Sequence, residues 1–273
     1  MIIDCHLHLK GHAMPPDYLR DAERYGVDFV CVSGLGKWNY EPPHEDCVET
    51  NRDVLREMKR YHPSVLGFCY VNPRHREAVD ELRWCIEQGM VGLKLWTGTF
   101  CDEPCVYPVI EAAIEMELPV MIHTFHKVVS PIRYESKPIN VVNLARRYPE
   151  AKLIMAHWGG EWRSGVRATE LCPSISMDTS GSILETEMTE TGVAKLGAER
   201  LVFGSDNSDL LAMLSKVYDA RISEHAKRMI LGDNMARLLC PFRIVETYPG
   251  LEFEGQPIER LITIARRPSR RAR

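Results

Sequence analysis

Short apolar runs alternate with amphipathic helical patterns along most of the chain. Almost every residue in these runs is apolar, as expected for parallel strands that are covered on both faces. Eight runs, each followed by a helical pattern, predict an α/β protein with the architecture of a (β/α)8 barrel. The predicted strands are Met1–Leu9, Phe29–Val32, Val65–Val71, Val91–Trp96, Pro119–His123, Lys152–His157, Ser174–Asp178 and Leu201–Asp206.

The helical segments have recognisable start and stop signals. A proline starts the first helix near Pro15, and Gly89 ends the helix before the fourth strand. After the eighth strand the pattern is helical from Asp209 to Cys240, with a predicted break and new N-cap at Gly232–Asp233. A doubly wound open sheet is the competing architecture, but it predicts a glycine-rich phosphate loop after the first strand, and none is present.

The alternation of strands and helices ends near residue 240. We therefore expect a barrel domain over residues 1–240 and a C-terminal extension over residues 241–273. The extension ends in a basic tail, Arg266–Arg273. A solvated, disordered end is the simpler interpretation of this tail than a nucleic-acid-binding arm.

Charge and cysteine content narrow the class of protein. A formal net charge of −4 gives no reason to expect nucleic acid as a partner. We expect neither a membrane-spanning segment nor a signal peptide, because no apolar stretch is long enough. The nine cysteines are an odd number and are scattered, which predicts buried thiols in a reducing, cytoplasmic compartment. Cys101 and Cys105 lack a second pair that would complete a zinc site, so we interpret them as structural.

The first strand ends in a His-x-His motif. Side chains two positions apart on a strand point to the same face, so His6 and His8 direct two imidazoles at one point. Two neutral ring nitrogens at one point are suitable ligands for a transition metal. By the same alternation, Cys5 is expected to face away from the imidazoles.

Further polar residues follow other predicted strands, namely Lys94, His123, His157 and Asp206. In a barrel, the C-terminal ends of all strands meet at one opening, where active sites lie. Three or four His and Asp ligands with one open position are typical of a catalytic zinc-like ion.

Such an ion activates a bound water and polarises a carbonyl. Asp206 is the best candidate for a general base, because one oxygen can bind metal while the other takes a proton. His157 is either a ligand or a donor that stabilises a developing oxyanion.

Four motifs resemble the amidohydrolase superfamily, and in particular its amidohydrolase-2 branch of TIM-barrel enzymes. They are Ile3–His8, Ala156–Gly160, Phe203–Asp206 and Ile230–Leu239. The branch contains metal-dependent hydrolases of small carboxylated compounds and non-oxidative decarboxylases related to aminocarboxymuconate semialdehyde decarboxylase. The resemblance covers about residues 1–240 and is more specific for the fold and the metal site than for the substrate.

The resemblance also implies a metal site. Carried over, the ligands of one divalent ion, most often zinc, are His6, His8, His123 and Asp206, with His157 beside them as a catalytic residue. In binuclear superfamily members a carbamylated lysine bridges two metals, and Lys94 lies at the matching place. We favour a free Lys94 and one metal, in which case the lysine can bind a substrate carboxylate.

Substrate contacts are expected from the loops after the strands. The small-molecule substrate is expected to meet six loop residues: His12, Trp96, His126, Arg133, Trp158 and Glu161. Of these, Arg133 can grip a carboxylate through two hydrogen bonds. The oligomeric state is open, with a homo-oligomer among the options.

Three functions are compatible with these residues. We expect a metal-dependent hydrolase that cleaves a small, carboxylated ester, lactone or amide through a metal-activated water. A non-oxidative decarboxylase of a small unsaturated or aromatic acid is the alternative. A non-catalytic sugar- or metal-binding barrel is third, and the presence of a general base at Asp206 speaks against it.

Overall fold

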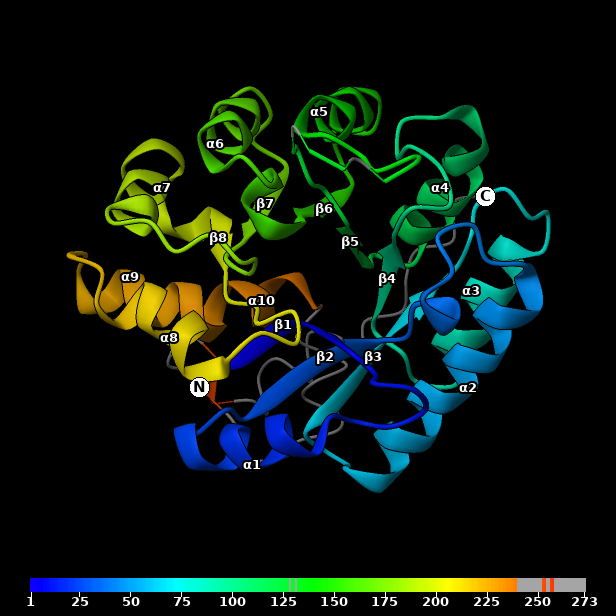
Figure 1. Ribbon diagram of the computed structural model, residues 1–273, viewed down its shortest axis with the longest axis horizontal. Helices are drawn as coiled ribbons and strands as arrows, with labels where there is room; N and C mark the ends of the chain where they lie inside the picture. The colour runs from blue at the N-terminus through cyan, green and yellow to red at the C-terminus, as the bar shows by residue number, and fades with distance from the viewer. Residues whose placement is uncertain (128, 131, 240–251, 254–255, 258–273) are drawn as a thin grey trace.

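The computed structural model describes residues 1–127, 129–130, 132–239, 252–253 and 256–257, and its barrel confirms the predicted fold class. Eight parallel strands follow one another around the barrel in chain order, with helices outside them (Figure 1). The strands are β1 Ile3–His8, β2 Phe29–Ser33, β3 Val65–Tyr70, β4 Gly92–Leu95, β5 Pro119–Ile122, β6 Lys152–Met155, β7 Ile175–Asp178 and β8 Leu201–Val202.

Helices fill the connections between the strands. The α-helices are α1 Pro16–Tyr25, α2 His44–Arg60, α3 Ala78–Glu87, α4 Tyr107–Glu115, α5 Pro138–Arg147, α6 Trp162–Glu170, α7 Met188–Leu196, α8 Leu210–Tyr218, α9 Glu224–Arg228 and α10 Asn234–Leu238. Short helical turns add η1 Gly36–Trp38, η2 Pro104–Val106, η3 Ala156–Gly159, η4 Ala198–Arg200 and η5 Met229–Asp233.

The barrel closes where the last strand meets the first. β8 has only two residues, yet the chain beyond it continues alongside β1. The Cys5 amide donates to the Phe203 carbonyl at 2.8 Å, and the Asp206 amide donates to the His6 carbonyl at 2.7 Å. These bonds bring residues some 200 positions apart in the sequence to one edge of the opening formed by the C-terminal strand ends, here called the mouth.

Two hydrophobic layers hold the barrel together. Inside it, alternate strand residues such as Phe68, Met121 and Ile154 form one cluster. Their neighbours, such as Val120 and Leu153, face the helices and form a second, larger cluster. Because successive strand residues point to opposite faces, the apolar runs supply both layers, which explains why they lack an apolar–polar alternation.

A bulge in β1 changes which residues face the barrel interior. The pairing with β2 runs Asp4 to Val30 and then Leu7 to Val32, so β1 has one extra residue there. Cys5 consequently packs in the interior cluster, whereas Leu7 packs against the helices. The expectation that Cys5 faces away by simple alternation is wrong, because a bulge resets the side-chain direction. The same reset directs the His-x-His motif into the mouth.

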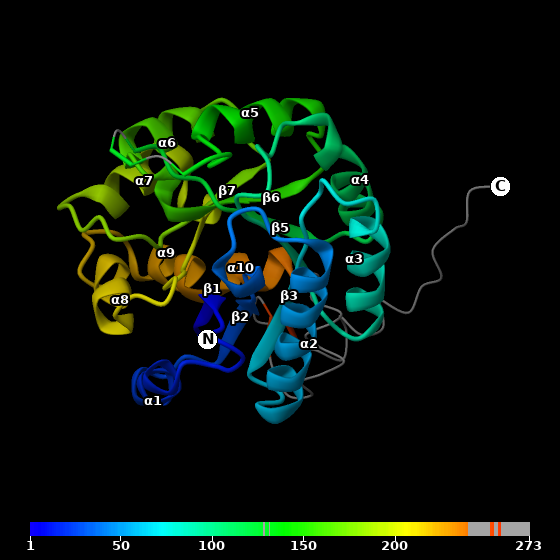
Figure 2. The ribbon, with the colours of Figure 1, turned by 45° about the vertical axis from the view of Figure 1, so that its right-hand side comes forward.

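The predicted helix break at Gly232–Asp233 is also wrong. The chain stays helical from α9 through the widened turn η5 into α10, and Asp233 has helical angles without a side-chain cap. Gly232 serves packing instead: a Cβ there would lie 2.4 Å from the Met1 carbonyl oxygen. Met235 and Leu239 from this segment join the interior cluster, and Figure 2 shows α10 beside β1.

Three further expectations concern the C-terminal extension, the cysteines and membrane-spanning helices. The basic tail lies outside the described residues; within the extension, the structure describes a short antiparallel pair, β9 Glu252–Phe253 and β10 Gln256–Pro257. In the described part of the chain, the eight cysteines are free and all but Cys105 are buried. Among the same residues, no helix combines the length and apolar character needed to span a membrane.

Candidate metal centre

Four histidines lie together at the mouth, in two pairs. In each pair, one ring nitrogen of each histidine faces a ring nitrogen of the other. His6 Nε2 and His8 Nε2 lie 3.0 Å apart, and His123 Nδ1 and His157 Nε2 also lie 3.0 Å apart. The His6 and His157 rings join the two pairs, with centroids 4.9 Å apart. The structure thus brings together the four histidines that sequence reasoning selected from β1, β5 and β6. We call them, together with Asp206, the histidine cluster.

The second nitrogen of each ring is held by a residue outside the cluster. The contacts are His6 Nδ1 to Asp178 at 2.7 Å, His8 Nδ1 to Ser33 at 2.9 Å, His123 Nε2 to Glu135 at 3.0 Å and His157 Nδ1 to Ser180 at 3.1 Å. A carboxylate only accepts hydrogen bonds, so the held nitrogens of His6 and His123 carry the proton. Their inward nitrogens therefore present lone pairs, as metal-binding imidazoles do.

Asp206 completes the cluster from the end of β8. Its Oδ1 lies 3.3 Å from His8 Nε2 and 3.5 Å from His6 Nε2, and its Oδ2 lies 3.5 Å from His157 Nδ1. Asp206 and Asn207 both have left-handed backbone angles, with φ of 52° and 56°. Hydrogen bonds between the Asn207 side chain and the His8 backbone, of 2.7 and 2.9 Å, hold this conformation.

The protonation states also suit a cation. Burial lowers the pKa of His8 to about 3 and lowers the pKa of His123 and His157 below the usual value for histidine. Burial acts to raise the pKa of Asp206, but the nearby His157 and His6 outweigh it and hold that pKa well below its usual range. Neutral imidazoles and an ionised carboxylate are the forms that bind a metal.

The donor set therefore fits a divalent ion. Donor atoms of His6, His157 and Asp206 all lie within 4.8 Å of one another. Convergent lone pairs and a carboxylate are stabilised when a cation binds between them. Nitrogen and carboxylate ligands of this kind suit zinc, and also manganese and iron.

Lys94 lies inside the cluster rather than on its rim. Its side chain on β4 is buried, and Nζ lies 2.9 Å from His6 Nε2. Burial lowers the pKa of Lys94 to about 8. The lysine is thus in contact with a histidine of the cluster, at the place where sequence reasoning expected it to bridge metals or bind substrate.

Asp178 and Ser180 were missed by sequence reasoning. Besides its bond to His6, Asp178 accepts a hydrogen bond of 2.5 Å from the Ser180 hydroxyl. A signal existed, because Asp178 ends the seventh predicted strand as His123 and Asp206 end theirs. For Ser33 and Glu135 the sequence offers no comparable signal, since their role depends on the packing of neighbouring strands and loops.

Lys216 holds the loop that carries Ser180. From α8, its Nζ donates to the carbonyl oxygens of Gly181 at 2.8 Å and Thr179 at 3.2 Å. These carbonyls flank Ser180 on both sides. Burial lowers the pKa of Lys216 to about 8. Lys216 therefore fixes the loop behind the His6 and His157 rings without touching them.

Aromatic side chains surround the cluster. Trp96 was expected at the mouth, and its ring centroid lies 6.4 Å from that of His123. Trp38 lies 6.0 Å from His8 and 5.9 Å from Trp96, and Tyr40 lies 5.2 Å from Trp96. On the other side, Phe125 stacks on His123 at 6.4 Å. Sequence reasoning found only Trp96 of this group, which we call the aromatic belt: Trp38, Tyr40, Trp96 and Phe125.

Three of the predicted substrate-binding residues have exposed side chains that contact other residues. His12 bonds to Asp53 on α2, with a distance of 2.6 Å between Nδ1 and Oδ2. His126 is exposed and lies 3.4 Å from the Ser164 hydroxyl. Arg133 is exposed and pairs with Glu41 at 3.3 Å. The structure shows no contact between these three and the histidine cluster.

The structure does not bring Trp158 and Glu161 to the mouth as predicted. The Trp158 indole is fully buried in the layer between barrel and helices, where a Cβ on Gly192 of α7 would lie 2.7 Å from the ring. The Glu161 carboxylate caps α6 by accepting bonds from the amides of Arg163 and Ser164. Both positions follow His157 closely, but a helical turn at η3 directs them away.

Similar solved structures share this fold. A dihydroxybenzoic acid decarboxylase from Polaromonas sp. JS666, with bound manganese and 2-nitroresorcinol, is 15% identical with a TM-score of 0.71, over 87% of this chain and 96% of its own. A 5-carboxyvanillate decarboxylase from Sphingomonas paucimobilis is 19% identical with a TM-score of 0.66, over 82% of each chain. A 4-oxalomesaconate hydratase from Rhodopseudomonas palustris is 17% identical with a TM-score of 0.63, over 88% and 95%.

Sequence comparison identifies the family. No curated protein sequence matches this chain closely enough to count as a relative. The amidohydrolase family profile, in contrast, matches residues 3–240, which include all eight strands and every residue of the histidine cluster. The chain therefore belongs to the amidohydrolase family.

Proposed function

We propose that this protein is a metal-dependent, non-oxidative decarboxylase of a small planar acid, aromatic or otherwise unsaturated. The aromatic belt carries this proposal. Four aromatic side chains stand around the histidine cluster, with ring centroids 5.8 to 6.4 Å from the nearest histidines where they touch it. Aromatic rings favour offset and edge contacts with other flat rings, so the belt suits a planar substrate better than a bulky aliphatic one.

The similar structures support the same chemistry. Two of the three compared above are decarboxylases of aromatic acids, and one of these has manganese and a nitro-substituted resorcinol bound. Their identity to this chain is below 20%, so the support comes from the shared fold and from the character of the mouth together.

The residues proposed to hold the metal are His6, His8, His123 and Asp206, the set that the family resemblance implies. His157, whose donor atom lies near those of His6 and Asp206, is assigned to proton transfer instead. A divalent cation bound there supplies a positive charge that orients a substrate carboxylate or oxyanion and stabilises negative charge during the reaction. Zinc is the metal we expect from the donor set, and manganese is a second option because one similar structure carries it.

The remaining chemistry needs a proton at the carbon that loses carbon dioxide. The bond between that carbon and the carboxylate breaks, its electron pair stays on the carbon, and a proton must arrive there. The Asp206 side chain is 28% exposed and is in contact with His157. We assign proton delivery to this pair. Asp206 exchanges a proton with solvent, and His157 orients the Asp206 carboxylate towards the substrate.

A test compares products directly. Metal-loaded protein is incubated with a panel of hydroxylated benzoates and unsaturated dicarboxylates, and carbon dioxide is measured by mass spectrometry. We expect release of one carbon dioxide per acid consumed, and an increase in KM for Trp96→Leu because the flat wall is lost. A panel that yields no carbon dioxide, while esters or lactones are hydrolysed, would overturn the decarboxylase proposal.

Hydrolysis is the second candidate, favoured by the geometry of Asp206. One carboxylate oxygen faces His6 and His8, while the other faces His157. An oxygen that is free of the metal can accept a proton from water and return it to a leaving group. Proton release from a lactone, ester or amide panel, without carbon dioxide, identifies this function.

A further inference from the structure

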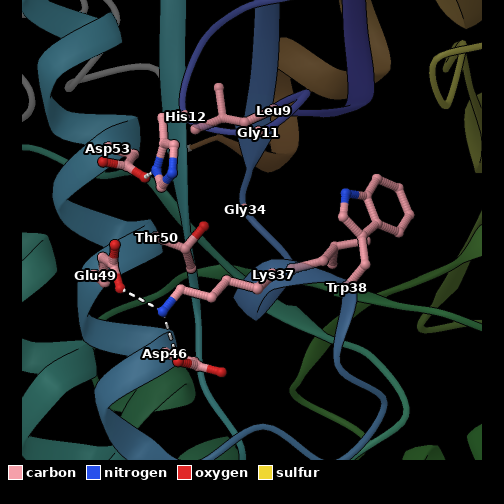
Figure 3. A pocket seen from close by; sticks show the side chains of 11 residues that line it. Leu9, Gly11, His12, Gly34, Lys37, Trp38, Asp46, Glu49, Thr50 and Asp53 are labelled. Carbon is pink, nitrogen blue, oxygen red and sulfur yellow. Dashed lines mark hydrogen bonds and ion pairs between the residues drawn. The ribbon is translucent and has the colours of Figure 1, made fainter.

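A second cavity, apart from the histidine cluster, lies beside the mouth and is lined in part by Trp38. Its volume is about 250 Å³, slightly below the usual range for small-molecule pockets. Three segments line it: the loop after β1, the segment from Gly34 to Trp38 and the first turns of α2 (Figure 3). Trp38 lines this cavity and also contacts His8, so one side chain borders both the cavity and the histidine cluster.

Charged groups in the cavity are paired across it. The Lys37 ammonium lies 2.8 Å from Glu49 and 3.2 Å from Asp46. The His12 ring is bonded through Nδ1 to Asp53 on α2, which leaves Nε2 on the outer side of the ring. Hydrogen-bond donors, on Lys37 and His12, therefore alternate with carboxylate acceptors along one wall of the cavity.

One hydroxyl in this wall faces the cavity. Thr50 is only 6% exposed, and its hydroxyl makes no hydrogen bond within the part of the chain that the structure describes. Figure 3 shows this hydroxyl directed into the space between His12 and Lys37. The adjacent Gly34 is required for this, because a Cβ there would lie 1.7 Å from Thr50 Oγ1. Because this oxygen faces the cavity instead of another protein group, it is open to a hydroxyl of a ligand.

The backbone beside the cavity is held in an unfavourable conformation. Lys37 and Trp38 in η1 both have left-handed angles, with φ of 57° and 59°. Non-glycine residues adopt such angles at a cost and persist in them where the surroundings enforce them, often at binding sites. Here the strain places the ammonium between two carboxylates and the half-exposed indole on the side of the mouth.

The chemistry of the wall excludes simple ions. An anion would meet three carboxylates, from Asp46, Glu49 and Asp53, while a cation would compete with Lys37, which already neutralises part of their charge. A hydroxyl group matches the wall because it donates to a carboxylate and accepts from an ammonium or imidazole at once. Neighbouring hydroxyls on a ring or chain can use several such positions, and their C–H face can lie on the Trp38 indole.

We propose that this cavity is a subsite for a hydroxyl-rich group, such as a sugar or polyol unit, of a ligand whose reactive end lies at the histidine cluster. The location of the reactive end rests on the proposed function. The binding of a polyol in the cavity does not rest on the proposed function, because none of the residues that line the cavity belongs to the histidine cluster.

Direct binding to the full-length protein tests the subsite. The probes are D-mannitol, myo-inositol and methyl β-D-glucopyranoside, with sodium acetate and isopropylammonium chloride as ionic comparisons. Saturation-transfer NMR and Trp38 fluorescence report binding in protein stripped of metal with a chelator, so turnover plays no part. We expect at least one polyol to bind with millimolar affinity, and Thr50→Val to weaken it fivefold or more.

A matched variant separates the hydroxyl from general effects of the substitution. Thr169→Val removes a buried helical hydroxyl on α6, outside the residues that line the cavity, and should leave polyol affinity unchanged. Circular dichroism and thermal melting confirm that both variants fold. Absence of binding by all three polyols, tighter binding of either ion, or undiminished polyol binding by folded Thr50→Val would each overturn the subsite. None of these results affects the decarboxylase proposal, which carbon dioxide release tests separately.

Discussion

Two aspartate–histidine pairs in this protein have nearly the same hydrogen bond and different surroundings. Asp178 holds His6 at 2.7 Å, and Asp53 holds His12 at 2.6 Å. Both aspartates are buried. The His6 ring is buried on a strand with its second nitrogen facing His8 and Asp206, whereas the His12 side chain is 63% exposed on a loop beside the second cavity.

The role of such a pair is decided by where the second nitrogen points. At His6 the strand, the bulge and the carboxylate together direct one lone pair into the cluster, so the pair prepares a ligand. At His12 the same bond only orients an exposed ring. Residues on strand ends thus carry the chemistry that needs fixed geometry, and residues on the following loops contact the variable parts of a ligand.

The largest expected effect comes from the strand-end carboxylate itself. Asp206→Asn removes the proton-carrying oxygen, and we expect turnover to fall about a thousandfold, because general acid–base groups contribute about 10²–10⁴ in rate. Steady-state kinetics on the substrate found in the carbon dioxide assay measures this. Asp209→Asn, which alters only the cap of α8, is the matched control. Activity of Asp206→Asn within tenfold of wild type would remove Asp206 from the mechanism.

The two pairs can be compared directly by neutralising each aspartate. Asp178→Asn leaves His6 without its carboxylate partner, and we expect metal affinity to fall about 10- to 100-fold, as for other residues that orient metal ligands. Asp53→Asn should leave metal affinity unchanged. Competition with a chromophoric chelator gives both constants. Equal effects of the two substitutions would show that position on strand or loop does not distinguish the pairs.

The buried His8 should also affect the stability of the protein in acid. The pKa of His8 is lowered from about 6.5 to about 3 in the folded protein, so below pH 6.5 the unfolded chain binds a proton that the folded protein does not. Stability of the metal-free protein should therefore fall as the pH drops from 6.5 towards 3, by about 1.4 kcal/mol per pH unit for this group.

Urea unfolding as a function of pH measures that slope. His8→Gln should make the slope shallower by the contribution of one proton. The raised pKa of Asp4, about 6 through burial, acts in the opposite direction below pH 6, and it is present in wild type and in His8→Gln alike. A slope that His8→Gln leaves unchanged would contradict a neutral, buried His8.

The smallest effect is expected one step further from the cluster. Lys216→Met removes the ammonium that holds the carbonyls of Thr179 and Gly181, and we expect metal affinity to weaken about threefold through loosening of Ser180 and Asp178. Lys216→Arg, which can still donate to both carbonyls, should recover most of the affinity. A loss of thermal stability without any change in metal affinity would restrict Lys216 to a structural role.

The sequence predicted the strand-end residues well for a physical reason. A parallel strand in a barrel has a defined direction and end, so the residue after an apolar run must lie at the mouth, as His123, His157 and Asp206 do. Asp178 followed the same rule and was overlooked because its strand is less apolar. The prediction that successive strand residues face opposite sides failed only at Cys5, where β1 has a bulge. The local pattern of apolar and polar residues does not reveal a bulge.

Loop residues could not be placed in the same way. Trp158 and Glu161 follow His157 directly, yet the left-handed turn at η3 directs one into the core and makes the other a helix cap. Trp38, Tyr40 and Phe125 reach the aromatic belt through loop conformations that no periodicity encodes. The partners Glu135 and Ser33 depend on which segments are neighbours in space, which only the closed barrel determines.

The central claim is that the histidine cluster holds one divalent ion. Elemental mass spectrometry of protein purified without chelators, for wild type and Lys94→Ala, tests it most directly. We expect about one equivalent of zinc or manganese in both proteins. Two equivalents in wild type that fall to one or none in Lys94→Ala would contradict a single-ion centre and make Lys94 a bridge, and no bound metal in wild type would contradict the centre altogether.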